Sequence, residues 1–357
     1  MQIRNIQILR GVAAIAVLFY HINIWEAKFL AGHTITPVFF SWGFSGVDLF
    51  FVISGFIMVF IQPAPLDSRT SYLRFMINRL TRIYPPVWLV MLALLPVWLM
   101  HPEYFNHYCG NHVDIFRSFF LLPQDYTPLL GVAWTLTHEV YFYLVVSLAL
   151  RFGPRGRWMF GCAWFLIVLV TFSLFKETEF YKIRILQQIF SPFSMTFLLG
   201  YFIGLAFNQI RKIPSPLAVG FLLTGIFSLA LGCIMPWPYD IGGYPDNNNL
   251  HRFLVCGLSA ALLVTSAVAL EARLPQPVLR LGFFGDISYA LYLTHLPFIC
   301  AYYIVLSKLH LTSPWEILGA LVICVASCLM LATLFHFYLE LKLTRKCRQL
   351  LEKYFQL

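Results

Sequence analysis

Four apolar stretches of the sequence each contain an ionisable side chain that could take part in acid–base chemistry. His21 lies in "RGVAAIAVLFYHINIW", Asp48 in "SWGFSGVDLFFVISGF", Glu139 in "GVAWTLTHEVYFY" and His295 in "GDISYALYLTHLPF". A histidine can accept and return a proton near neutral pH, and a carboxylate can orient its imidazole ring. Ionisable groups are costly in apolar surroundings and usually face a polar cavity or pathway. A single buried histidine could equally be a hydrogen-bonded structural residue.

Three arginines could bind an anion. Arg10 lies near the start of the first apolar stretch, and Arg79 and Arg82 occur in "FMINRLTRIYPPVW" at i and i+3, on one face if this segment is helical. Guanidinium groups bind phosphates through paired hydrogen bonds. For Arg79 and Arg82, the spacing alone favours a simpler interpretation, in which both cations orient the chain in a membrane and contact lipid headgroups.

The composition decides the environment of these residues. Of the 357 residues, 59% are hydrophobic and only 11% are charged, whereas soluble domains have roughly 45–50% apolar and about 25% charged residues. This excludes a water-soluble protein and predicts an all-α, polytopic membrane protein. The net charge of +9 does not indicate nucleic-acid binding, because the cations occur in short clusters between apolar runs. The cysteines form no CxxC pair, and no metal site is expected.

Ten stretches are long and apolar enough to span a membrane, since a spanning helix needs about 20 apolar residues. No cleavage pattern of a signal peptide follows the first stretch, and no polar insert separates the others, so we expect one integral domain over 1–357. The third stretch is short and interrupted by prolines. The predicted spans are 6–25, 42–62, 83–100, 130–150, 158–176, 189–208, 216–235, 250–270, 282–306 and 315–338.

The distribution of lysine and arginine predicts the orientation. If the N-terminus is cytoplasmic, 18 of the 25 Lys and Arg residues lie inside and 7 lie outside, which predicts that both termini are cytoplasmic. Arg252 is counted here among the outside cations. Depth, estimated at about 1.5 Å per residue, then brings His21, Asp48, Glu139 and His295 to the outer half of the membrane. Ionisable groups from four helices at one level predict a functional cavity.

Arg10 and His21 lie near opposite ends of the first predicted span. From Arg10 to His21 is 11 residues, or roughly 16 Å along a helix, which is about the reach of an extended pantetheine arm. A coenzyme A nucleotide could therefore rest on cytoplasmic arginines while its thioester lies beside His21 in the membrane interior.

Five sequence patterns, taken in this order, resemble the integral-membrane acyltransferase 3 family over almost the whole chain. The patterns are "ILRGVAAIAVLFYH", "GVDLFFVISGF", "RLTR", "AWTLTHEVYFY" and "SYALYLTH". The opening "NIQILRG" and the lack of an appended domain are most similar to the bacterial branch that acetylates exopolysaccharides and O-antigens. The resemblance implies about ten helices in the bacterial inner membrane and an acyl-CoA donor, above all acetyl-CoA. It also implies an acceptor hydroxyl on a polysaccharide or a lipid-linked sugar.

The same resemblance implies roles for individual residues. Arg10 and His21 match the paired residues of the family's first helix, and Arg79 and Arg82 match its cytoplasmic pair, which would hold the donor. Glu139 matches the acidic residue of a WSLxxE-like pattern. The preceding His138 departs from that pattern and receives no role.

Acyl transfer from a thioester to an alcohol needs a base for the hydroxyl proton and a group that stabilises the oxyanion. We expect His21 to be the base, with either Asp48 or Glu139 orienting its ring. His295 or a helix-end N–H group would stabilise the oxyanion. No G-x-S-x-G pattern accompanies these residues, which favours direct transfer over a serine acyl-enzyme.

Other functions stay open at this point. Proton-coupled carriers also place His, Asp and Glu in the membrane, so the alternative is a transporter or flippase of a glycan or small metabolite. A scaffold needs no buried ionisable cluster and is disfavoured. The outer segments 101–114 and 236–249 carry aromatic, amide and acidic groups that suit a sugar, although plain solvated loops have the same composition. The sequence does not fix the acyl group, the acceptor sugar or its position, and it is compatible with a homo-oligomer.

Overall fold

The structure is a computed structural model in which the described residues form helices and their connections, with no β-strand among them. Ten helical segments of the described chain are long and apolar enough to cross a membrane, which confirms the predicted all-α membrane architecture. The described residues are 3–29, 35–36, 38–106, 110–232, 250–271, 273, 275–309, 311 and 313–357.

The helices follow the predicted spans closely, with short helical turns between several of them. The bounds are α1 Arg4–Phe29, η1 Val38–Phe44, α2 Ser45–Phe60, α3 Arg69–Met100, α4 Ile115–Phe120, α5 Trp134–Ala149, α6 Pro154–Phe175, α7 Glu179–Lys182, α8 Arg184–Ile189, α9 Pro192–Leu205, α10 Phe207–Ile210, α11 Ser215–Gly232, α12 Leu250–Arg252, η5 Phe253–Gly257, α13 Leu258–Ala269, α14 Gln276–Leu279, α15 Gly282–Asp286, α16 Ser288–Leu306, α17 Pro314–Phe335, η7 His336–Glu340 and α18 Leu341–Tyr354.

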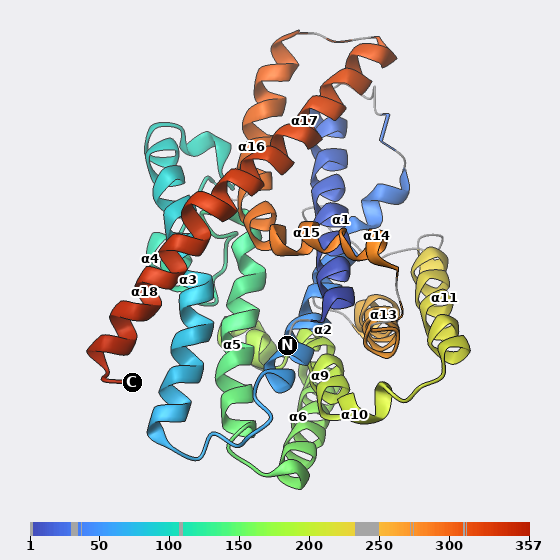
Figure 1. Cartoon of the computed structure of the whole chain (residues 1–357). Coiled ribbons are helices and arrows are strands. Elements are labelled where there is room, and N and C mark those ends of the chain that lie inside the picture. The colour runs from blue at the N-terminus through green and yellow to red at the C-terminus, as the bar shows by residue number, and fades with distance from the viewer. Residues whose placement is uncertain are drawn as a thin grey trace.

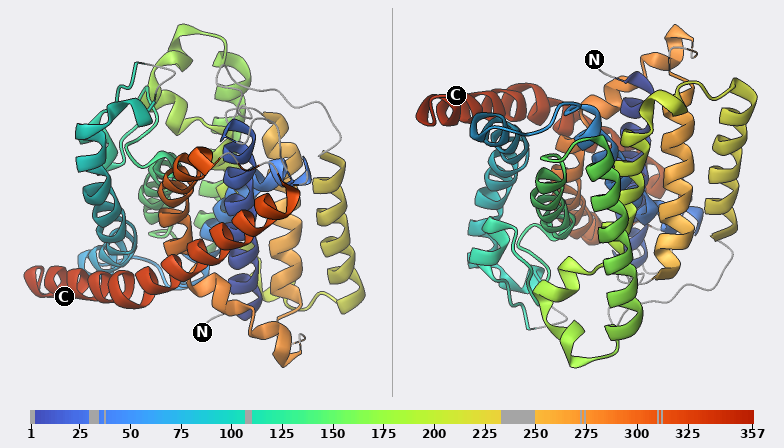
Figure 2. Two further views of the ribbon diagram at one scale, coloured as in Figure 1. Left: turned by 90° about the horizontal axis from the view of Figure 1, so that it is seen from above. Right: turned by 90° about the horizontal axis from the view of Figure 1, so that it is seen from below.

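Helix α1 lies in the interior of the bundle and packs against α2, α15 and α16 (Figure 1). Around it, α2 packs along α9, α11 pairs with α13, and α16 pairs with α17. Figure 2 shows that α1, α11 and α13 run along a common direction, and that α1 begins and α18 ends at the same end of the bundle. The helices that carry the candidate chemistry, α1, α3, α5 and α16, are therefore central elements or their direct neighbours.

Two glycines allow α2 and α9 to approach very closely. A Cβ atom at Gly55 would collide with the carbonyl oxygen of Phe197, and one at Gly200 would collide with the carbonyl oxygen of Val52. Gly200 and Gly204 form the G-x-x-x-G spacing that brings membrane helices together, because small residues let the backbones touch. This contact fixes the position of α2, which contributes to the site described below.

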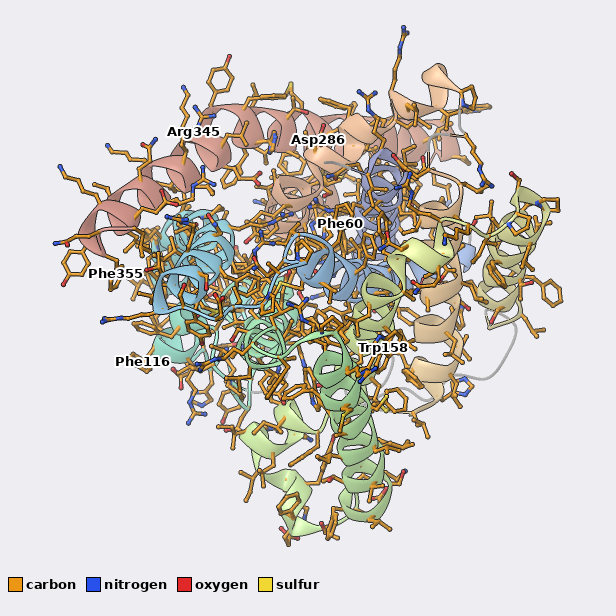
Figure 3. All side chains as sticks on the ribbon, turned by 60° about the horizontal axis from the view of Figure 1, so that its bottom comes forward. Phe60, Phe116, Trp158, Asp286, Arg345 and Phe355 are labelled. Atoms are coloured by element: carbon orange, nitrogen blue, oxygen red, sulfur yellow. The ribbon has the colours of Figure 1, made fainter. Side chains whose placement is uncertain are left out.

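Large apolar side chains are exposed around the perimeter of the bundle. Phe116 on α4 is 65% exposed and Trp158 on α6 is 41% exposed, and both are labelled in Figure 3. A water-soluble protein would not leave so many such side chains uncovered. Together with the ten spans, this surface identifies a multi-pass membrane protein whose perimeter is covered by lipid.

The third span differs from the expectation. It was predicted to begin at residue 83 and to be interrupted by prolines, but α3 begins at Arg69 and continues through Pro85, Pro86 and Pro96. The start is fixed by Ser68, whose side chain accepts a hydrogen bond from the Ser71 N–H in a capping box. Prolines are tolerated in membrane helices because neighbouring groups satisfy the freed carbonyls. The consequence is that Arg79 and Arg82 lie on a long continuous helix.

The orientation of the bundle can be tested by cysteine labelling. Asp67 lies between α2 and α3, just before α3 begins, and Glu177 lies between α6 and α7, just after α6 ends. Both residues are exposed. Because the sequence-based count assigns 18 of the 25 cations to the side of the N-terminus, we expect the end of the bundle where α1 begins to be cytoplasmic. In intact cells, an impermeant maleimide should label Glu177→Cys and miss Asp67→Cys. The opposite pattern would reverse the orientation.

Candidate active site

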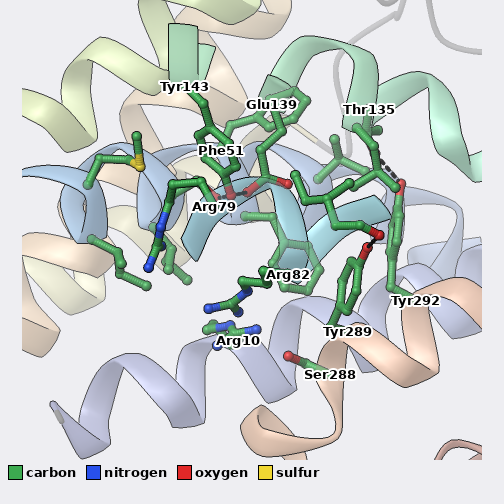
Figure 4. A pocket seen from close by; sticks show the side chains of 18 residues that line it. Arg10, Phe51, Arg79, Arg82, Thr135, Glu139, Tyr143, Ser288, Tyr289 and Tyr292 are labelled. Atoms are coloured by element: carbon green, nitrogen blue, oxygen red, sulfur yellow. Dashed lines mark hydrogen bonds between the residues drawn. The ribbon is translucent and has the colours of Figure 1, made fainter. Parts of the chain in front are cut away.

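A pocket between α1, α2, α3, α5 and α16 contains the three arginines that the sequence singles out, Arg10, Arg79 and Arg82 (Figure 4). The cavity volume is about 60 Å³. Arg10 comes from α1 and Arg82 from α3, and Figure 4 shows their guanidinium groups lying next to each other. The fold thus brings together the residues that were predicted to bind the donor.

The charges in this pocket do not balance. Among the described residues, three arginines line the pocket, and Glu139 is the only carboxylate in its lining. Arg10 is 8% exposed and donates from Nη1 to Oε1 of Gln7 at 3.2 Å, while the buried Nε of Arg79 has no hydrogen-bond partner among the described residues. Guanidinium groups that are buried in excess repel one another and lose hydration, which is costly. An anionic ligand would offset this cost, so the pocket has the chemistry of an anion-binding site.

Glu139 lies on the wall of this pocket. Its Oε1 accepts hydrogen bonds from the hydroxyl of Ser54 on α2 at 2.9 Å and from the hydroxyl of Tyr143, one turn further along α5, at 2.5 Å. These two bonds hold the carboxylate among the arginines. These contacts thus join Glu139 to the arginine pocket, and its predicted role in orienting His21 stays a prediction.

His21 and His295 are in direct contact, in agreement with their predicted common depth. The Nε2 atom of His295 lies 3.1 Å from Nδ1 of His21, and the ring centroids are 4.9 Å apart. Each ring also approaches the carbonyl oxygen four residues earlier in its own helix. These distances are 2.9 Å from His21 Nδ1 to the Val17 oxygen and 2.9 Å from His295 Nδ1 to the Leu291 oxygen.

These contacts assign the tautomers of the two rings. A carbonyl oxygen can only accept a hydrogen bond, so in the neutral rings both Nδ1 atoms carry the hydrogen. The single Nδ1–H of His21 is then shared between the Val17 carbonyl oxygen and the lone pair on Nε2 of His295, and Nε2 of His21 carries the other lone pair of its ring. His295 thus occupies the position beside Nδ1 of His21 in which a carboxylate was expected. In this arrangement it has no hydrogen left to donate to an oxyanion, so its predicted oxyanion role is not supported.

Asp48 is held in a buried ion pair and does not contact His21. The Arg252 guanidinium donates to Asp48 Oδ2 from Nη2 at 2.8 Å and from Nε at 3.0 Å, and to Oδ1 from Nε at 3.3 Å. The two side chains are 2% and 0% exposed, and Arg252 also lies over the rings of Phe44 and Phe193. In this structure the carboxylate of Asp48 is thus engaged by Arg252, and the Arg252 side chain, which was counted among the outside cations, is buried.

Tyr292 connects the arginine pocket with the histidine pair. Its side chain lines the pocket, and its ring centroid lies 5.9 Å from that of His295. Its hydroxyl is fixed by Thr135 Oγ1 at 2.7 Å and by the Val132 carbonyl at 3.0 Å. Neither His21 nor His295 lines the pocket, so Tyr292 belongs to the wall between the two sites. The sequence analysis missed Tyr292, although its i, i+3 spacing to His295 in "SYALYLTH" places both on one helix face.

The fold and these contacts define a multi-pass helical membrane protein in which one helix, α1, links a cationic pocket to a pair of histidines. The model of the acyltransferase domain family matches residues 3–333, so the chain belongs to the acyltransferase 3 family. This confirms the resemblance stated on the five sequence patterns.

Two relatives illustrate this membership. The exopolysaccharide production protein ExoZ of Rhizobium meliloti is 30% identical over 272 residues, which cover 72% of this chain and 76% of that protein. The O-acetyltransferase OatA of Staphylococcus aureus is 26% identical over 336 residues, which cover 83% of this chain but only 51% of OatA. No solved structure matches the chain significantly.

Proposed function

We propose that this chain is an acyl-CoA-dependent O-acyltransferase of a bacterial inner membrane. It would move an acyl group, above all acetyl, to a hydroxyl of an exported or cell-envelope polysaccharide or of its lipid-linked precursor. The observation that carries the proposal is the excess of positive charge in the pocket formed by Arg10, Arg79 and Arg82. Membership of the acyltransferase 3 family and the names of ExoZ and OatA support the reaction class and the kind of acceptor.

The donor would bind with its phosphates in the arginine pocket. Guanidinium groups form charge-assisted, paired hydrogen bonds with phosphate oxygens, and Arg79 has a buried Nε that needs an acceptor. Since Arg10 and His21 share one helix and lie roughly 16 Å apart along it, the pantetheine arm would run beside α1 and past Tyr292. The thioester would then reach the histidine pair.

The chemistry would use the free lone pair on Nε2 of His21. As the acceptor oxygen attacks the thioester carbon, its proton passes to His21 Nε2, and a tetrahedral intermediate forms. When the carbon–sulfur bond breaks, the coenzyme A thiolate leaves and takes the proton back from His21. The lone pair of His295 and the Val17 carbonyl oxygen would share the Nδ1–H of His21 and stabilise the imidazolium, so His295 is a positioning residue.

The direct test is transfer of label. Membranes that contain the protein are incubated with acetyl-CoA labelled in the acetyl group, and the glycan fraction is extracted and counted. We expect base-labile label in the glycan, and none with membranes that lack the protein. Movement of an unlabelled glycan or metabolite across the membrane, with no label incorporated, would instead favour the proton-coupled transporter.

Donor binding gives a separate prediction. Arg79→Ala and Arg82→Ala should each weaken acetyl-CoA binding by about 10- to 100-fold, since a hydrogen bond to a charged group contributes about 1.5–3 kcal/mol. Lysine should restore little of the affinity, because an ammonium lacks the bidentate geometry of guanidinium. Arg155→Ala is the matched control, since Arg155 is exposed at the start of α6 and does not line the pocket. Affinities unchanged in both pocket variants, measured by calorimetry on folded protein, would argue against a phosphate site.

A further inference from the structure

The last helical segment is too long to lie within a membrane. Helices α17 and α18, with the π-helical turn η7 between them, form a continuous segment from Pro314 to Tyr354 of 41 residues. At 1.5 Å per residue it is about 60 Å long, which is roughly twice the thickness of the hydrocarbon core of a bilayer. Since α17 is the apolar part, α18 must lie at or beyond the membrane surface.

The arrangement of the helices places α18 at that surface. In both views of Figure 2, α18 runs across the direction of α1 and α13, at the end of the bundle where α1 begins. It packs against α3 and projects past its neighbours along one edge of the molecule, where Arg345 and Phe355 are labelled in Figure 3. No residue of α18 is buried.

The sequence of α18 divides into two faces. Apolar residues recur at helical spacing on one face, where Leu350 is 59% exposed, Leu351 is 38% exposed and Tyr354 is 78% exposed. These side chains are uncovered by protein in the described chain. The other half of the helix carries a single acidic residue, Glu352, and five cations that make no ion pair with the described residues. The cations are Lys342, Arg345, Lys346, Arg348 and Lys353.

We infer that α18 is an interfacial helix that binds anionic phospholipid. An exposed apolar face together with a cationic face is typical of a helix that lies in the headgroup region, with its apolar side chains toward the acyl chains and its cations on lipid phosphates. Position favours lipid over an acidic protein, because α18 continues directly from a membrane span and crosses the end of the bundle. By packing on α3, the lipid-bound helix would support the helix that carries Arg79 and Arg82.

Spin-label accessibility in nanodiscs tests this inference on the full chain. A nitroxide is placed at position 350, on the apolar face, or at position 349, on the polar half. The discs contain phosphatidylcholine with or without phosphatidylglycerol. In the anionic discs, the label at 350 should collide mainly with oxygen and the label at 349 mainly with a water-soluble nickel complex. Equal access of nickel to both positions, or shielding of both from both reagents by covering protein, would overturn the inference.

The cations give the second arm of the test. Each surface cation changes the affinity for an anionic membrane by roughly five-fold, so Arg345→Gln, Lys346→Gln and Arg348→Gln together should weaken it by about 100-fold. The label at 350 should then become several-fold more accessible to nickel, as it should for the unchanged chain in discs of phosphatidylcholine alone. Arg211→Gln with Lys212→Gln, an exposed pair between α10 and α11, should leave the label unchanged. A label at 350 that is indifferent to anionic lipid and to the triple substitution would refute lipid binding by these cations.

Discussion

Replacing His21 by glutamine is expected to slow acyl transfer by about 10²–10⁴-fold while acetyl-CoA still binds. Glutamine keeps much of the size and hydrogen bonding of histidine but cannot take the proton of the acceptor hydroxyl. The donor phosphates would still be held by Arg10, Arg79 and Arg82, which lie in a pocket that His21 does not line. The measurement is the transfer rate of purified protein saturated with acetyl-CoA, followed across pH. The rising limb that an imidazole base gives should be absent from the variant.

The matched control for this experiment is His138→Gln. His138 is a histidine of another span that packs on the rings of Phe51, Trp134 and Phe193; of these, Phe51 lines the arginine pocket, but His138 itself does not. This variant should keep most of the rate and the pH profile. If His21→Gln keeps near-normal turnover at saturating donor, His21 is a structural histidine and the base is another group.

Removing the charge of Asp48 is expected to have the largest effect on stability. In the Asp48→Asn variant, Arg252 stays buried but loses the carboxylate to which it donates three hydrogen bonds. Breaking a buried ion pair by removing one partner costs about 3–5 kcal/mol. We expect a clear fall in the thermal stability of the purified protein, measured by the loss of monodisperse protein after heating. A stability equal to that of the unchanged protein would mean that the pair contributes little.

The double variant Asp48→Leu with Arg252→Met separates a structural role from a catalytic one. Replacing both members of a buried pair by apolar residues of similar size is often neutral or even stabilising. The double variant should therefore recover most of the stability that Asp48→Asn loses, and it should transfer acyl groups. A double variant that is stable but inactive would return Asp48 to the catalytic residues.

The proximity of His21 and His295 could be predicted from the sequence, because rise per residue and span boundaries are enough to estimate that they share a level. That estimate placed His21 and His295 at one level, and they are in contact at 3.1 Å. The number of spans followed from the apolar runs in the same way. The rotation of each helix about its axis is set by packing, which no single span encodes. Counting along the chain therefore did not reveal that Glu139 faces Arg10 rather than His21.

Two further differences have specific physical causes. Arg252 was counted among the outside cations because it lies at the edge of an apolar run, yet Asp48 and the faces of Phe44 and Phe193 make its burial favourable. Pro85 and Pro86 looked like an interruption, but α3 continues through them. The groups that make the burial of Arg252 favourable come from other elements of the fold, so a local sequence pattern could not indicate them.

The central claim is that the acyl group passes from a donor bound at one end of the bundle to an acceptor near the other, along α1. The most direct measurement uses sealed proteoliposomes with the protein inserted in one orientation. Acetyl-CoA, labelled in its acetyl group and unable to cross the membrane, is supplied on one side, and a glycan fraction from the cell envelope on the other. We expect labelled glycan only when the donor is on the side of the arginine pocket, where α1 begins, and the glycan is on the opposite side. Label transferred only when donor and glycan share one side would contradict it.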